Sequence, residues 1–181
     1  LPGFVSEAPV YLDTYLAAWD ALMEKKIDEA TTLYEEVDRQ RAVVSGTMKG
    51  KDFIGFSDTD AFLSCFLEAF VHDRYIWIPF ESLAELSIDP PGSFLDLLWA
   101  PARAVTWEGM SVQCYLPVSY HDPSSADDQG ARLGRMTDWR PLGGSYYKGL
   151  GQHVFAAGDE EISLFELGEV AFRANRKKEP T

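Results

Sequence analysis

Residues 75–80 read Tyr-Ile-Trp-Ile-Pro-Phe and form the densest part of a long apolar and aromatic stretch. Successive side chains of a strand point to opposite faces, so Tyr75 and Trp77 share one face and the two isoleucines share the other. Because both faces are apolar, the pattern predicts a strand that is covered on both sides. Pro79 cannot donate a ladder hydrogen bond, so we expect the strand to end there or to lie at an edge.

Two amphipathic helices are predicted before this strand. Apolar residues recur at helical spacing from Tyr11 to Leu22 and again from Ile27 to Val37, with a short link between them. The second begins K-I-D-E-A, which resembles a tetratricopeptide repeat, so we predict a tetratricopeptide-like hairpin over residues 1–45. One hairpin cannot bury its own apolar face, so it must pack on the following domain or on upstream helices. The chain begins with Leu rather than Met, so packing on helices upstream of residue 1 stays one of the two alternatives.

Residues 46–181 predict a mixed α+β domain with a mostly antiparallel sheet, so the fold class is α+β. The helix expected here covers residues 62–70, with Ser57 to Asp60 as its N-cap and His72 near its C-terminal end. The remaining expectations are a linker at 42–50, a strand at 52–56, a turn at 81–86, a hairpin pairing 102–105 with 111–116, and a strand pair at 149–157 and 161–167.

The formal net charge of −13 bears on the choice of partners. Such an acidic surface repels nucleic acid and anionic lipid, so neither is expected as a partner. No apolar run is long enough to span a membrane, and no signal peptide is visible, which favours the cytoplasm. Cys65 and Cys114 both fit buried positions, as is typical of a reducing compartment.

The sequence offers little chemistry, and we predict no catalytic, cofactor or metal site. His121 and Asp122 with Ser124 and Ser125 resemble a triad, but adjacent residues of one loop seldom converge on an oxyanion hole. A small hydrolase built on them is one alternative. Asp58 and Asp60 are paired carboxylates, and a metal-dependent binding module on them is another. His153 is expected to be half-buried in a strand.

Four of the five tryptophans separate into two predicted groups. Trp77 and Trp99 lie in apolar strand patterns, where aromatic residues usually form the core. Trp19 lies on the stripe of the first helix and Trp107 at the tip of a hairpin. Aromatic residues at such positions are typical of partner anchors.

An ordered series of short motifs runs through most of the chain. The series is D-x-D (Asp58, Asp60), L-E (Leu67, Glu68), R-Y-x-W-x-P-F (74–80), D-L-x-W-x-P-A (96–102), P-x-x-Y (117–120), A-R-L-G-R-x-T-x-W (131–139) and G-L-G-Q-x-V (149–154). It resembles the ImpE family, also called TagJ or SciE, accessory proteins of bacterial type VI secretion. Members usually carry an Arg and a Gly-Pro between the first two motifs. This chain has Ala61 to Phe66 there instead, which is a departure from the family pattern.

The resemblance implies a non-enzymatic adaptor with an N-terminal helical-repeat part and a C-terminal α+β part. It also implies contact with the small sheath subunit TssB, and through it a link to the sheath-recycling ATPase ClpV. An amphipathic helix laid in a hydrophobic groove is the mode that we expect for such a contact. From the helical stripe, and not from the family, we predict that Tyr11, Tyr15 and Trp19 bind the partner.

Overall fold

The computed structural model describes residues 2–5, 7–121 and 126–174 and has a mixed α+β fold. Its helices are α1 (Leu12–Met23), α2 (Ile27–Gln40), α3 (Gln129–Arg132) and α4 (Leu164–Leu167), with 3-10 turns η1 (Phe80–Ser82) and η2 (Leu95–Leu97). Its strands are β1 (Gly3–Phe4), β2 (Ser45–Met48), β3 (Lys51–Ile54), β4 (Phe56–Asp58), β5 (Phe66–Val71), β6 (Arg74–Pro79), β7 (Leu83–Ile88), β8 (Trp99–Thr106), β9 (Ser111–Pro117), β10 (Thr137–Gly143), β11 (Tyr146–Gly151), β12 (Val154–Ala157), β13 (Glu160–Ser163) and β14 (Glu169–Arg173).

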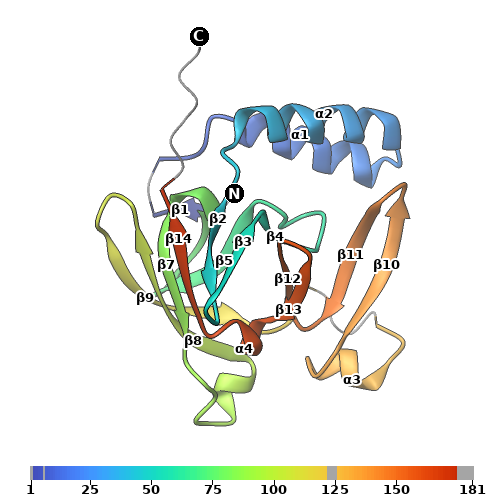
Figure 1. The fold of residues 1–181 in the computed structure, drawn as a ribbon. Helices are drawn as coiled ribbons and strands as arrows, with labels where there is room; N and C mark the ends of the chain where they lie inside the picture. Colours follow the sequence, from blue (N-terminus) through green and yellow to red (C-terminus); the bar gives the residue numbers. More distant parts are fainter. Residues whose placement is uncertain (1, 6, 122–125, 175–181) are drawn as a thin grey trace.

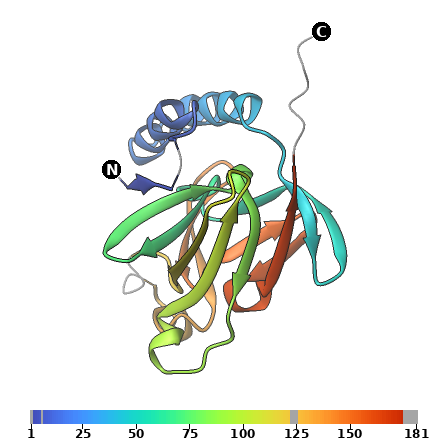
Figure 2. The same cartoon turned by 90° about the vertical axis from the view of Figure 1, so that its left-hand side faces the viewer.

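A nine-stranded sheet forms the body of the molecule, in the order β1-β6-β5-β9-β8-β7-β14-β2-β3. Its pairings are antiparallel except for the short parallel pair of β1 and β6. The sheet curls strongly, so that β2 and β3 come round towards β4 and β12 (Figures 1 and 2). Its inner face and the sheet β13-β12-β4 enclose the main core, which includes Ile78, Phe80 and Phe155.

The two long helices lie together across one end of this body (Figures 1 and 2). α1 directs Tyr15 and its neighbours onto the outer face of β5 and β6, where Phe66 and Trp77 form a second aromatic core. The rings of Phe66 and Trp77 stack with centroids 5.0 Å apart, and Tyr15 meets Phe66 edge-on at 5.1 Å. The predicted helical hairpin is therefore confirmed, and the α+β part covers its apolar stripe. The tetratricopeptide-like label for the hairpin stays a prediction.

The strand prediction at residues 75–80 is confirmed by β6, which ends at Pro79. Ile76 and Ile78 pack in the main core, while Trp77 packs in the second core under the helices. A strand with two apolar faces is thus covered on both sides. The β8–β9 hairpin with its tip at 107–109 is also present. The strand pair predicted at 149–157 and 161–167 is confirmed only as the shorter β12–β13 hairpin, because residues 149–151 belong to β11 and residues 164–167 form α4.

The helix predicted at 62–70 is wrong. Residues 61–65 form turns, and β5 then pairs with β6 along its whole length. An apolar run of this length is compatible with a buried helix or a buried strand. Here the pairing with β6 stabilises the strand. Consequently Asp58 and Asp60 cap no helix, and His72 lies in the β5–β6 turn with a φ of 55°.

Two other expectations are wrong for the same kind of reason. The predicted linker at 42–50 contains β2, which pairs with β3 and β14. The predicted turn at 81–86 contains most of β7, which lies between β14 and β8. β2 has only four residues, and β7 mixes apolar and polar residues without strict alternation, so their pairing partners identify them as strands. Among the described residues, no helix has the length and hydropathy to cross a membrane.

Candidate functional site

A cluster of polar side chains is buried where β4, β5 and the segment before β12 meet. Its centre is His153, which lies between two carboxylates and is 3% exposed. Nδ1 of His153 is 2.8 Å from Asp58 Oδ2, and Nε2 is 3.5 Å from Glu68 Oε2. The first contact is a hydrogen bond and the second an ion pair without one. His153 is therefore fully buried, not half-buried as predicted.

Further hydrogen bonds fix both aspartates of the D-x-D motif. The Tyr120 hydroxyl donates to Asp58 Oδ1 at 2.6 Å, and the same oxygen accepts from the backbone N–H of Asp60 at 2.8 Å. The Asp60 carboxylate accepts from the backbone N–H groups of Gly149 and Phe62, at 2.7 and 2.8 Å. These contacts tie β4 and the turn after it to β11 and to the segment that carries Tyr120.

Glu68 extends the cluster towards the aromatic core under the helices. Its Oε1 accepts from the Tyr75 hydroxyl at 2.8 Å, and the Tyr75 oxygen accepts from the Trp77 indole N–H at 2.8 Å. Tyr75 and Trp77 lie on the same face of β6, as predicted, and this shared face allows the chain of hydrogen bonds. The polar cluster and the aromatic core are thus one connected unit.

The contacts within the cluster shift the pKa values of its titratable side chains. Burial disfavours the charged imidazole, but the hydrogen bond and charge of Asp58 and the charge of Glu68 outweigh it and raise the pKa of His153 to about 9. Burial, together with the charge of Asp58, raises the pKa of Asp60 to about 6. Burial opposes ionisation of Glu68, yet its contacts with His153 lower its pKa overall. At neutral pH His153 is therefore an imidazolium, held between Asp58 and Glu68.

This geometry is suited to structure more than to catalysis. Asp58, Asp60 and His153 are each 3% exposed, so a substrate has no access to them in this conformation. Among residues 2–5, 7–121 and 126–174, no group of three or more potential ligands is arranged for a metal ion. The cluster unites residues from the D-x-D, L-E, R-Y-x-W and P-x-x-Y motifs. Several motifs of the ordered series therefore converge on one place, which their scattered sequence positions did not reveal, whereas D-L-x-W-x-P-A lies apart from it.

A second feature, on the surface, is an exposed apolar patch around η2 and the start of β8. Its six large side chains, between 42% and 78% exposed, are Phe94, Leu95, Leu97, Leu98, Trp99 and Tyr115. Phe70, Trp99 and Tyr115 line a shallow groove within it, and the rings of Phe70 and Trp99 meet edge-on at 5.1 Å. Monomeric proteins seldom leave so many neighbouring apolar side chains in water, so this patch is a candidate binding surface.

The loop that carries the patch is held in shape from within. The Asp96 carboxylate accepts hydrogen bonds from the backbone N–H groups of Gly92 and Ser93, at 2.8 and 2.9 Å, and from the Ser93 hydroxyl at 2.8 Å. Pro90 and Pro91 further limit its conformations. A surface fixed in this way loses less conformational entropy when a partner binds.

Two of the three predicted partner-binding residues are inaccessible in this structure. Tyr11 is 1% and Tyr15 0% exposed, because both pack on Phe66 beneath the helices. Trp19 is half-buried, and its ring centroid lies 5.3 Å from that of Trp77. The structure brings the three together, but as packing of the hairpin on the sheet. Their role in partner binding stays a prediction.

The other singled-out residues divide as follows. Trp77 is buried, as predicted, whereas Trp99 is 42% exposed and its assignment to the core is wrong. On β8 the alanines 100, 102 and 104 face the core, so Trp99 faces outwards by alternation.

Trp107 is exposed at its hairpin tip, and both cysteines are buried and free. His121 is exposed, while Asp122, Ser124 and Ser125 lie outside the described residues.

Comparison with known proteins gives three findings. A family model described as "ImpE protein" matches residues 50–171. The type VI secretion system accessory component TagJ of Pseudomonas aeruginosa is 32% identical over 171 residues, which cover 94% of this chain and 59% of that protein. The crystal structure of protein VPA1032 from Vibrio parahaemolyticus has a TM-score of 0.79 at 19% identity, covering 94% of this chain and 66% of that one. The chain thus spans less than two thirds of either protein, and the crystal structure supports the fold alone.

Proposed function

The chain belongs to the ImpE family, and on that premise we propose that it is a non-enzymatic accessory protein of bacterial type VI secretion. It acts in the cytoplasm as an adaptor. Its partner in this proposal is the small sheath subunit TssB, through which it is linked to sheath recycling by ClpV. The name of the Pseudomonas relative supports the secretion role, and the resemblance noted in the sequence suggests the two partners.

The observation that carries a binding function is the exposed apolar patch. A surface with Leu95, Trp99 and Tyr115 open to water is stabilised when another apolar surface covers it. The net charge of −13 opposes pairing with a second copy and favours a segment with basic flanks. We therefore propose an amphipathic helix of the sheath subunit as the occupant, with its apolar side on the patch.

The hairpin is the second candidate surface, on the sequence argument for Tyr11, Tyr15 and Trp19. It lies at the opposite end of the molecule from the loop before β8 (Figures 1 and 2). Binding to Tyr11 or Tyr15 requires the hairpin, proposed as a unit over residues 1–45, to separate from the α+β domain proposed over 46–181. Because the two surfaces are far apart, variants of each can be tested separately.

A peptide titration distinguishes the two surfaces. A fluorescent N-terminal peptide of the small sheath subunit is titrated with the protein and followed by anisotropy. The double variant Leu95→Ser and Trp99→Ser should bind about thirtyfold more weakly, the usual effect of losing an aromatic hot spot. Ile54→Ser is the matched control, because Ile54 is an exposed apolar residue on β3. Equal binding by wild type and the patch variant, with loss in a folded Tyr15→Ala and Trp19→Ala variant, would move the site to the hairpin.

The hydrolase alternative is tested directly. A panel of ester and peptide substrates should give background rates with the purified chain. Turnover that disappears in His121→Ala would replace the adaptor proposal with a hydrolase. His121 is exposed, so this variant is not expected to disturb folding.

A further inference from the structure

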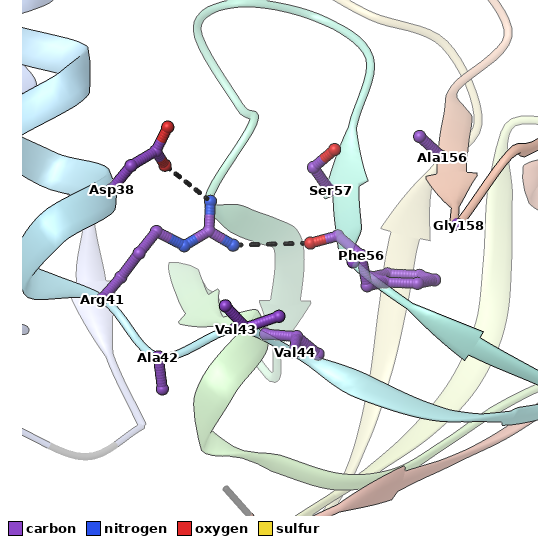
Figure 3. Close-up of a pocket in the computed structure, with 10 residues that line it drawn as sticks. Asp38, Arg41, Ala42, Val43, Val44, Phe56, Ser57, Ala156 and Gly158 are labelled. Carbon is purple, nitrogen blue, oxygen red and sulfur yellow. Dashed lines mark hydrogen bonds and ion pairs between the residues drawn. The ribbon is translucent and has the colours of Figure 1, made fainter. Parts of the chain in front are cut away.

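A separate hollow lies where the end of α2, the segment 42–44, and strands β4 and β12 meet (Figure 3). The polar cluster is not part of it, because Ser57 points to the face of β4 opposite Asp58. The patch around η2 is made of other residues. The hollow is lined by Asp38, Arg41, Ala42, Val43, Val44, Gly55, Phe56, Ser57, Ala156 and Gly158.

Arg41 brings a buried positive charge to this hollow, and the carboxylate of its ion pair, Asp38, is exposed and lies at the edge of contact distance (Figure 3). Its side chain is 12% exposed, and its guanidinium lies 3.1 Å from Cys65 Sγ and 3.4 Å from the Phe56 carbonyl oxygen. Asp38, which is 74% exposed, is 4.0 Å away. Burial raises the pKa of Cys65 to about 11, so at neutral pH its sulfur is a thiol and a weak acceptor.

A second carboxylate, Glu81, acts on the charge of Arg41 without forming an ion pair with it. Glu81 accepts a hydrogen bond from the Tyr11 hydroxyl, and Glu81 and Arg41 form no ion pair. A guanidinium has five N–H donors in a planar fork that matches a carboxylate. The contacts described for Arg41 are long or made to weak acceptors, so its donors are poorly used.

The rest of the hollow offers space and a second polar group. Ser57 and Ala156 lie opposite each other in the β4–β12 ladder and form a floor of small side chains. A Cβ added to Gly55 would meet no atom within 4 Å, so the space beside it is open. Among the described residues, nothing forms a hydrogen bond with the Ser57 hydroxyl. Val43, 64% exposed, gives the rim an apolar edge.

We propose that this hollow binds a carboxylate that carries a small aliphatic group. Arg41 receives the carboxylate, the Ser57 hydroxyl donates to it, and the aliphatic group packs on Val43 and Ala156. A single negative charge is matched by the single cation. A phosphate would bring almost two charges to one Arg in a strongly acidic chain, which is unfavourable. The carboxylate can come from a free short-chain acid or from the C-terminus of a peptide that ends in a small apolar residue.

The test is a titration of the full ¹⁵N-labelled chain followed by NMR. Three ligands are compared: isobutyrate, a short peptide ending in Val with a free C-terminus, and the same peptide with a C-terminal amide. Saturable shifts of the Gly55, Ser57 and Gly158 amides are expected with the carboxylates, and at least about tenfold weaker binding with the amide. Stronger binding of the peptide than of isobutyrate identifies a chain terminus as the source, and the reverse identifies a free acid.

Variants make the test decisive. Arg41→Gln should weaken carboxylate binding at least about tenfold, whereas Arg39→Gln, at an exposed position in the last turn of α2, should not. Ala156→Leu fills the hollow without touching Arg41 and should also abolish binding, so the outcome does not depend on Arg41→Gln folding. No saturable shift in the wild type, equal binding of acid and amide, or unchanged binding in Ala156→Leu would overturn the proposal.

Discussion

Replacing Asp58 with Asn removes the charge that faces His153 while keeping the size of the side chain. Asp58 is 3% exposed and holds three partners: His153 at 2.8 Å, Tyr120 at 2.6 Å and the Asp60 backbone N–H at 2.8 Å. Breaking a buried charge pair by removing one partner typically costs about 3–5 kcal/mol, and here the more distant Glu68, at 3.5 Å, is left as the carboxylate beside the imidazolium. We expect Asp58→Asn to lower the free energy of unfolding at neutral pH by this amount.

The pH dependence gives a second, sharper signature. The pKa of His153 is raised from 6.5 to about 9, so its stabilising contribution is complete below about pH 6.5 and is lost as the pH rises through about 9. That difference corresponds to about 3 kcal/mol, the amount that the wild type should lose across this window. Asp60, whose pKa is raised to about 6, affects stability at lower pH. There the free energy of unfolding falls as the pH rises and the Asp60 carboxyl ionises. In Asp58→Asn the loss between about pH 6.5 and 9 should largely disappear.

Urea unfolding at about pH 6.5 and at about pH 9 measures both effects. Asp159→Asn is the control, because it makes the same change of charge at an exposed position. If the wild type and Asp58→Asn lose equal stability between the two pH values, His153 is not the titrating group. The account of the cluster would then be wrong.

Two other predictions concern the packing around the cluster. Trp77→Ala should cost about 3–5 kcal/mol through the cavity left between Trp19 and Phe66, measured as a lower urea midpoint; an unchanged midpoint would refute the packing role. Gly149→Ala should cost about 1–3 kcal/mol, because the added Cβ would lie 2.2 Å from the Tyr120 ring, whose hydroxyl donates to Asp58. A Gly149→Ala variant with wild-type thermal stability would show that Tyr120 can move without loss.

Local patterns in the sequence determined several elements. The two helices of the hairpin have a 3.6-residue apolar period, and β6 has two apolar faces ended by Pro79. The β8–β9 hairpin follows from two strand patterns around Trp107 to Gly109. These features depend on neighbours in the chain, so they can be predicted without knowing the fold. The motif series also indicated the family, although it did not indicate what the motif residues do.

Other features were decided only by tertiary structure. The apolar run at 66–71 became β5 because β6 was available to pair with it, and Asp58 became the partner of His153, 95 residues away, instead of a helix cap. Trp99 faces water because the curled sheet takes the small alanines of β8 into its core. Arg41 and Ser57 line one hollow only because α2 ends beside β4. In each case the local conformational preference of the segment is weak. Contacts between residues distant in sequence supply the free energy that selects the observed structure.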